Sequence, residues 1–106
     1  MKFSFQKQPV PPNTPATALN VGTWDGKPLI LIGKELYACT PDITKLDGYS
    51  VSAALYVALK ERFGWTHADA AEVLKTSART AEGMPLGRVS VRSRLSLCHI
   101  AAGINS

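Results

Sequence analysis

The sequence is poor in the residues from which metal sites and catalytic sites are most often built. It has two cysteines and two histidines among 106 residues, and neither Cys39 nor Cys98 belongs to a group with zinc-ligand spacing. We therefore predict no metal and no cofactor, and we expect both thiols to be buried as small apolar side chains. Phosphate-binding glycine loops and nucleophile motifs are also missing from the sequence, so we predict no catalytic residues and no enzyme.

Long apolar stretches are missing as well. The longest aliphatic run is Leu29–Ile32, far shorter than the roughly 20 residues that a membrane-spanning helix needs. The first residues, Met-Lys-Phe-Ser-Phe-Gln-Lys, lack the apolar core of a secretory signal. We therefore expect a cytoplasmic protein with reduced thiols and no membrane association.

Positive charge is what the chain does have, and it is concentrated in the second half. The net charge is +4, and every arginine lies at or after position 62. From Lys75 onward the basic side chains are opposed by Glu82 alone. Because basic stretches attract polyanions and arginine suits planar contacts with phosphate and guanine, nucleic acid is the first partner to consider. An ordinary solvated helix face is the alternative explanation of this charge.

Residues 1–47 are predicted to form a short β-meander. Asp25-Gly26 lies between two alternating stretches, which is a strong hairpin signal because a type I′ turn needs positive φ at both central residues. Prolines between positions 9 and 15 predict an irregular linker, and Pro41 is expected to end the β region. Strands this short should pack on the helices or on a second copy. The expected strands are Leu19–Trp24, Lys27–Ile32 and Glu35–Cys39, with a shorter one at Phe3–Phe5.

Residues 48–106 are predicted to form four helices, because the apolar period lengthens to about 3.6. We expect Ser50 to be the N-cap of the first helix and Gly64 its left-handed C-cap. Thr66 and Asp69 should form a capping box for the second helix. The predicted fold is therefore α+β, a β-meander followed by a four-helix domain.

The third and fourth helices have their own signals. Ser77 is the expected N-cap of the third helix, and Pro85 should end it. The fourth helix should run from about Val89 to Ala102 and stop at Gly103. Its predicted buried face is Val91, Leu95, Cys98 and Ala102.

The second and third helices have the pattern of a helix-turn-helix. Ala71 is the small residue where the helices would cross, Leu74 and Thr76 bracket the turn, and Ala81 and Met84 would anchor the third helix from behind. Residues 66–88 resemble the Cro/phage-repressor-like (Xre) helix-turn-helix family, and the resemblance extends over 48–102 with the flanking helices. The matching positions are Ala71, Leu74, Ser77, Arg79-Thr80, Glu82-Gly83 and Gly87-Arg88. The chain departs from the family where Lys75 replaces a turn glycine, Ala70 and Ala81 replace larger residues, and Met84-Pro85 replaces Trp-Glu.

The resemblance implies a sequence-specific, double-stranded-DNA-binding transcriptional regulator, a repressor or autoregulator. The helix Ser77–Met84 would enter the major groove, and the protein would bind as a twofold homodimer. We expect residues 1–47 to form the dimer interface or to bind another protein. The implied base contacts are Ser77, Ala78 and Arg79, and the implied phosphate contacts are Thr66, His67, Lys75, Arg88, Arg92 and Arg94.

Two other functions remain open at this point. The departures from the family favour a small protein-binding inhibitor or adaptor, such as a phage anti-defence protein, that uses the fold without reading DNA. Binding of single strands or RNA is a weaker alternative, because the basic stretch carries no aromatic platform. Arg79 could also pair with Glu72 or Glu82, and Arg92 and Arg94 cannot both point the same way on a helix.

Overall fold

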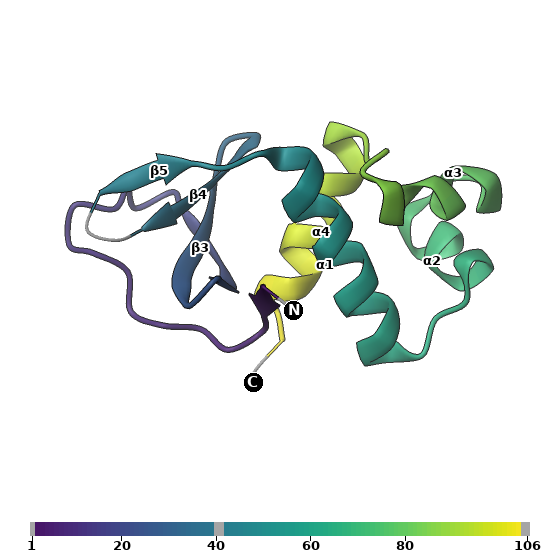
Figure 1. Ribbon diagram of the computed structural model, residues 1–106, viewed down its shortest axis with the longest axis horizontal. Helices are drawn as coiled ribbons and strands as arrows, with labels where there is room; N and C mark the ends of the chain where they lie inside the picture. The colour runs from purple at the N-terminus through teal and green to yellow at the C-terminus, as the bar shows by residue number, and fades with distance from the viewer. Residues whose placement is uncertain (1, 40–41, 105–106) are drawn as a thin grey trace.

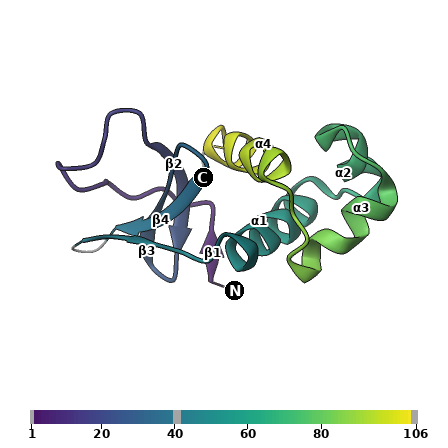
Figure 2. The ribbon, with the colours of Figure 1, turned by 90° about the horizontal axis from the view of Figure 1, so that it is seen from above.

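The computed structural model describes residues 2–39 and 42–104, and it has the α+β fold that the sequence predicts. Five antiparallel strands pair in chain order, and helices follow. Figure 1 shows the sheet at one end, α1 and α4 in the middle, and α2 and α3 at the other end; Figure 2 shows the same order from above. The molecule is elongated, about 40 × 24 × 22 Å. The elements are β1 (Phe3–Ser4), β2 (Leu19–Trp24), β3 (Lys27–Ile32), β4 (Glu35–Cys39), β5 (Ile43–Lys45), α1 (Gly48–Phe63), α2 (His67–Leu74), α3 (Ala78–Gly83), the 3₁₀ helix η1 (Met84–Leu86) and α4 (Val91–Ala102).

The predicted hairpin is confirmed. Asp25 and Gly26 have φ of 54° and 79°, which is the pair of positive values that a type I′ turn requires. The strand β5 was not predicted: the β region continues beyond position 41, because Ile43–Lys45 pairs antiparallel with β4. The prediction that the β region ends at Pro41 was therefore wrong. Pro41 itself lies outside the described residues.

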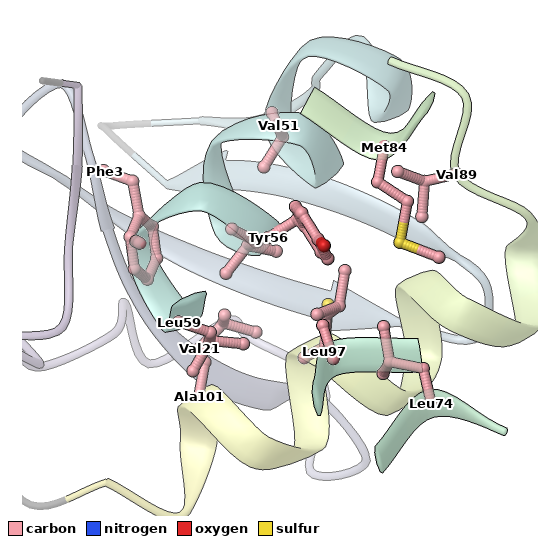
Figure 3. Packing of buried hydrophobic residues seen from close by; sticks show 14 of the residues in the cluster. Phe3, Val21, Val51, Tyr56, Leu59, Leu74, Met84, Val89, Leu97 and Ala101 are labelled. Atoms are coloured by element: carbon pink, nitrogen blue, oxygen red, sulfur yellow. The ribbon is translucent and has the colours of Figure 1, made fainter. Parts of the chain in front are cut away.

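One hydrophobic core joins the sheet to the helices. Figure 3 shows Phe3 and Val21 from the strands packed with side chains from α1 and α4. The strands therefore pack on the helices, which is one of the two arrangements expected from the sequence; the other was packing on a second copy. Segments 1–47 and 48–106 thus share one core. Its largest fully buried members are Val21, Leu29, Leu36, Val51, Leu55, Tyr56, Leu59, Met84, Leu97 and Cys98.

The ends of the helices follow the sequence with one exception. Gly64 ends α1 with φ 67°, and Ser77 caps α3, as predicted. The capping box of α2 is present, with Thr66 N donating to Asp69 Oδ2 at 3.0 Å and Asp69 N donating to Thr66 Oγ1 at 3.1 Å. The prediction of Ser50 as the N-cap of α1 was wrong, because the helix begins at Gly48.

Asp47 is the N-cap of α1 instead. Its side chain accepts from Tyr49 N at 3.2 Å and from Ser50 Oγ at 2.8 Å. The Ser50 hydrogen bond, followed by the Tyr49 one, holds the pKa of Asp47 below its ordinary value of 3.8. Ser50 therefore supports the cap as a donor from the first turn.

The predicted buried face of α4 was partly wrong. Cys98 is buried, but Val91 is exposed, and Leu95 and Ala102 are only half-buried. The helix is rotated so that two polar residues face inward, where they find hydrogen-bond partners in the protein. Its buried residues are Ser93, Arg94, Leu97, Cys98 and Ala101.

Both cysteines are buried free thiols, as predicted. Burial raises the pKa of Cys98 to about 12, and it also raises the pKa of Cys39. Burial therefore favours the protonated thiol at both positions. Among the helices in the described part of the chain, none is long and apolar enough to cross a membrane.

Candidate nucleic-acid interface

A three-residue turn, Lys75-Thr76-Ser77, joins α2 to α3. Lys75 is left-handed, with φ 55° and ψ 49°, although an L-residue pays about 1–2 kcal/mol for that conformation. Thr76 N donates to Ala71 O at 2.9 Å, and Lys75 N donates to Glu72 O at 3.3 Å. These bonds close the end of α2 and turn the chain sharply into α3.

The inner side of this pair of helices is buried as the sequence predicts. Ala71 and Leu74 from α2 are 4% and 5% exposed, while Ala81 and Met84 are fully buried. Figure 3 shows Met84 lying beside Val89, above the core. Met84 thus anchors the C-terminal end of α3, and Pro85 lies in η1 immediately after it.

The N-terminal end of α3 is exposed. Ser77, Ala78, Arg79 and Thr80 are all in contact with solvent. Ser77 Oγ accepts from Thr80 N at 3.1 Å and lies 2.9 Å from Thr80 Oγ1. Within residues 2–39 and 42–104, no carboxylate comes within 4.0 Å of the Arg79 guanidinium. Arg79 therefore forms no ion pair with Glu72 or Glu82, the two alternative partners considered from the sequence.

His67, at the start of α2, is held by a residue that the sequence reasoning missed. The buried Tyr56 Oη lies 2.8 Å from His67 Nδ1, and the two rings are stacked at 6.0 Å with 4° between their planes. Burial, and then the charge of Glu82, raise the pKa of Tyr56, so its hydroxyl stays protonated. In the tautomer in which His67 Nδ1 accepts from the Tyr56 hydroxyl, the ring proton is on Nε2. Tyr56 lies in α1, 11 positions before His67. No local sequence pattern around His67 therefore indicates this contact.

The predicted phosphate contacts separate into exposed and buried residues. Thr66, Lys75, Arg88 and Arg92 are exposed and His67 is half-buried. The exposed acidic residues of α2 and α3, which oppose these cations, are Asp69, Glu72 and Glu82.

Arg94 is not one of the exposed phosphate-contact candidates. The prediction that Arg94 contacts phosphate was wrong, because its side chain is buried. It is 6% exposed. Its Nε donates to Ser52 Oγ at 3.1 Å and its Nη1 donates to Lys34 O at 3.1 Å, with Glu35 Oε2 4.0 Å away. Arg92, two residues earlier, is exposed, so the two arginines point in different directions as helix geometry requires.

Comparison with known proteins adds no assignment. No family model, no curated protein and no solved structure matches the chain. Function is therefore inferred from the geometry of α2, its turn and α3, together with the charges that surround them.

Proposed function

We propose that this protein binds double-stranded DNA sequence-specifically and acts as a transcriptional regulator, a repressor or autoregulator. The observation that carries the proposal is the two-sided environment of α3. Ala81 and Met84 fix the helix from behind, while Ser77–Thr80 are exposed. A helix anchored in this way, with its N-terminal residues uncovered, suits insertion into the major groove.

Each exposed residue has a chemical role in this proposal. Arg79 would donate two hydrogen bonds to guanine O6 and N7, and Ala78 would contact a thymine methyl beside Ser77. Backbone phosphates would be met at the two ends of α2, by Thr66 and the Nε2 proton of His67 at one end and by Lys75 at the other. Arg88 and Arg92 would extend the phosphate contacts, and Arg94 takes no part.

The test compares two arginine variants that remove the same charge. Arg79→Ala should lower the affinity for the preferred duplex by about 5–150-fold, the loss expected for one bidentate base contact of about 1–3 kcal/mol. Arg62→Ala is the matched control, because Arg62 is exposed at the last turn of α1 beside Phe5, away from α3. Fluorescence anisotropy on preferred and scrambled duplexes measures both. Equal losses for the two variants, or no loss for Arg79→Ala, would contradict the assignment of α3 as the reading helix.

A second candidate function is supported by an exposed apolar patch formed by Tyr49, Leu86 and Val91. These side chains are 64%, 76% and 42% exposed. Tyr49 and Val91 line the same surface hollow. Gly87, the residue that follows Leu86, lies beside Tyr49, since a Cβ built on Gly87 would be 3.8 Å from Tyr49 Cβ. Clustered large apolar side chains mark protein interaction sites, so this Tyr49–Leu86–Val91 patch favours a protein-binding adaptor if DNA affinity proves weak and insensitive to sequence.

In the DNA-binding proposal the same patch holds the second copy of a twofold dimer. The sheet edges are poorer candidates than we expected from the sequence, because β1 has two residues and β5 exposes Lys45, a residue that discourages edge pairing. Leu86→Ser should then convert a dimer into a monomer in sedimentation equilibrium. If the dimer persists after this substitution, the patch is not the dimer interface, and the β segment becomes the better candidate.

A further inference from the structure

A tyrosine hydroxyl from the core reaches the start of α2. Tyr56 lies in α1 and is fully buried among the core side chains (Figure 3). Its Oη lies 2.8 Å from Nδ1 of His67, the first residue of α2, and the two rings are stacked with 4° between their planes. The contact therefore fixes both the position and the tilt of the imidazole ring.

The direction of this hydrogen bond follows from the burial of Tyr56. Burial, and then the charge of Glu82, raise the pKa of the Tyr56 hydroxyl above its ordinary value of 10.0, so the hydroxyl keeps its proton. Within the described ranges, His67 is the only hydrogen-bond partner of this hydroxyl. If Nδ1 carried the ring proton, the Tyr56 proton would be buried without an acceptor, which costs about 1–3 kcal/mol. The geometry therefore favours donation from Tyr56 to Nδ1, with the imidazole proton on Nε2.

The Nε2 atom of His67 can be reached from outside the protein. His67 is half-buried, and within residues 2–39 and 42–104 its Nε2 has no hydrogen-bond partner. The buried side-chain nitrogen and oxygen atoms that lack a partner in this part of the chain are Thr14 Oγ1 and Asn20 Oδ1. His67 Nε2 is not among them, so it retains accessible surface. Its neighbours in the sequence, Thr66 and Ala68, are exposed as well.

We propose that Tyr56 is a positioning residue for DNA binding, which holds His67 with its Nε2–H turned outward to donate to a backbone phosphate. The inference rests on the proposed function and adds to it the residue that prepares this contact. A ring that accepts at Nδ1 and donates from Nε2 carries no net charge, so the contact releases no counterion. Phosphate contacts orient a protein on the duplex without reading its sequence. The Tyr56–His67 pair should therefore contribute affinity but not sequence preference.

The first experiment observes the ring of His67 in the free protein. Nitrogen-15 NMR at about pH 8.5, above the ordinary titration range of histidine, distinguishes the two tautomers. The wild type should carry the ring proton on Nε2, and Tyr56→Phe should shift the Nδ1 resonance, because that atom loses its donor. Tyr37→Phe is the matched control, since it also removes a tyrosine hydroxyl but lies in β4, at the sheet end of the molecule (Figure 1). A wild-type ring proton on Nδ1, or an Nδ1 resonance that Tyr56→Phe leaves in place, would overturn the proposal.

The second experiment measures duplex affinity in a double-mutant cycle of Tyr56→Phe and His67→Ala. Tyr56→Phe keeps the core ring and should fold. It should lower the affinity by about two- to tenfold, the value of one hydrogen bond, equally on preferred and scrambled duplexes. The slope of log affinity against log salt concentration should not change, because no cation is removed. The double variant should bind no more weakly than His67→Ala alone, because Tyr56 acts through His67.

The outcomes separate this inference from the proposed function. If Arg79→Ala weakens binding to the preferred duplex but Tyr56→Phe behaves like Tyr37→Phe, DNA reading stands and the positioning role is overturned. The positioning role is also overturned if the losses from Tyr56→Phe and His67→Ala add in full, since a purely structural effect would be independent of His67. If the wild type binds no duplex although its His67 proton is on Nε2, the proposed function fails, and the phosphate contact fails with it.

Discussion

At the scale of single residues, Arg94 shows how a charge that suggests nucleic acid can serve the fold. Its guanidinium joins α4 to Ser52 of α1 and to the backbone of the β3–β4 turn. Gly48 makes room for it, since a Cβ there would lie 2.6 Å from Arg94 Nη2. Arg94 thus links the sheet to the helices.

Arg94→Met should lower the free energy of unfolding by about 2–4 kcal/mol, because it removes charge-assisted hydrogen bonds and strands the buried Ser52 hydroxyl. Urea unfolding at neutral pH measures the loss. Arg92→Ala, two residues away on the exposed side of α4, is the control and should change stability by less than about 0.5 kcal/mol. Similar effects from both variants would mean that the buried contacts of Arg94 contribute nothing of their own.

Asp47 gives a prediction for the dependence of stability on pH. Since its pKa is lowered in the folded protein, its carboxylate stabilises the fold above the unfolded pKa, and this stabilisation is lost as the pH falls through the folded pKa. Asp47→Asn keeps a capping group without the charge. The wild type should therefore be more stable than Asp47→Asn at pH 6, and the difference should vanish as the pH falls below the folded pKa of Asp47. A difference that stays constant down to the lowest pH would show that the charge is not the cause.

At the scale of elements, the turn between α2 and α3 decides whether α3 is presented to a ligand. Lys75 holds the left-handed position there, where glycine is the usual residue. The capping box before α2 and the Ser77 cap after the turn fix both neighbouring ends.

Lys75→Gly should stabilise the protein by about 0.5–1 kcal/mol, because relief of the left-handed strain exceeds the extra chain entropy of glycine. Lys75→Ala keeps the Cβ and should bring no such gain. Urea unfolding separates the two. Both variants lose one cation per copy, so in a dimer each should reduce the salt slope of DNA binding by about 2. If Lys75→Ala stabilised the protein as much as Lys75→Gly, backbone strain at position 75 would not explain the gain in stability.

Sequence patterns predicted the elements whose signals are local. The Asp25-Gly26 hairpin, the Gly64 stop, the Thr66–Asp69 capping box and the Met84 anchor all depend on a few adjacent residues. The buried face of α4 could not be found in this way, because the partners that hold Arg94 inside, Ser52 and the backbone of Lys34, lie far along the chain. For the same reason, local patterns did not predict β5 or the Tyr56–His67 hydrogen bond.

At the scale of the whole molecule, the two ends have different surfaces. One end carries the exposed start of α3 with Lys75, Arg88 and Arg92 near it in sequence. The other end carries a pocket that is lined by uncharged residues of the segment 10–18 and by Asn20 and Ile30 of the sheet. A core shared by sheet and helices lies between them (Figure 3).

The most direct test of DNA reading is selection from a pool of random duplexes, with affinity for the bound fraction measured over a series of salt concentrations. We predict an enriched palindrome with half-sites about one helical turn apart. Each copy of a dimer contributes three cations, Lys75, Arg88 and Arg92. The slope of log affinity against log salt concentration should therefore be about −5. Weak binding with no enriched sequence would contradict the proposal, and the Tyr49–Leu86–Val91 patch would then be the place to look for a protein partner.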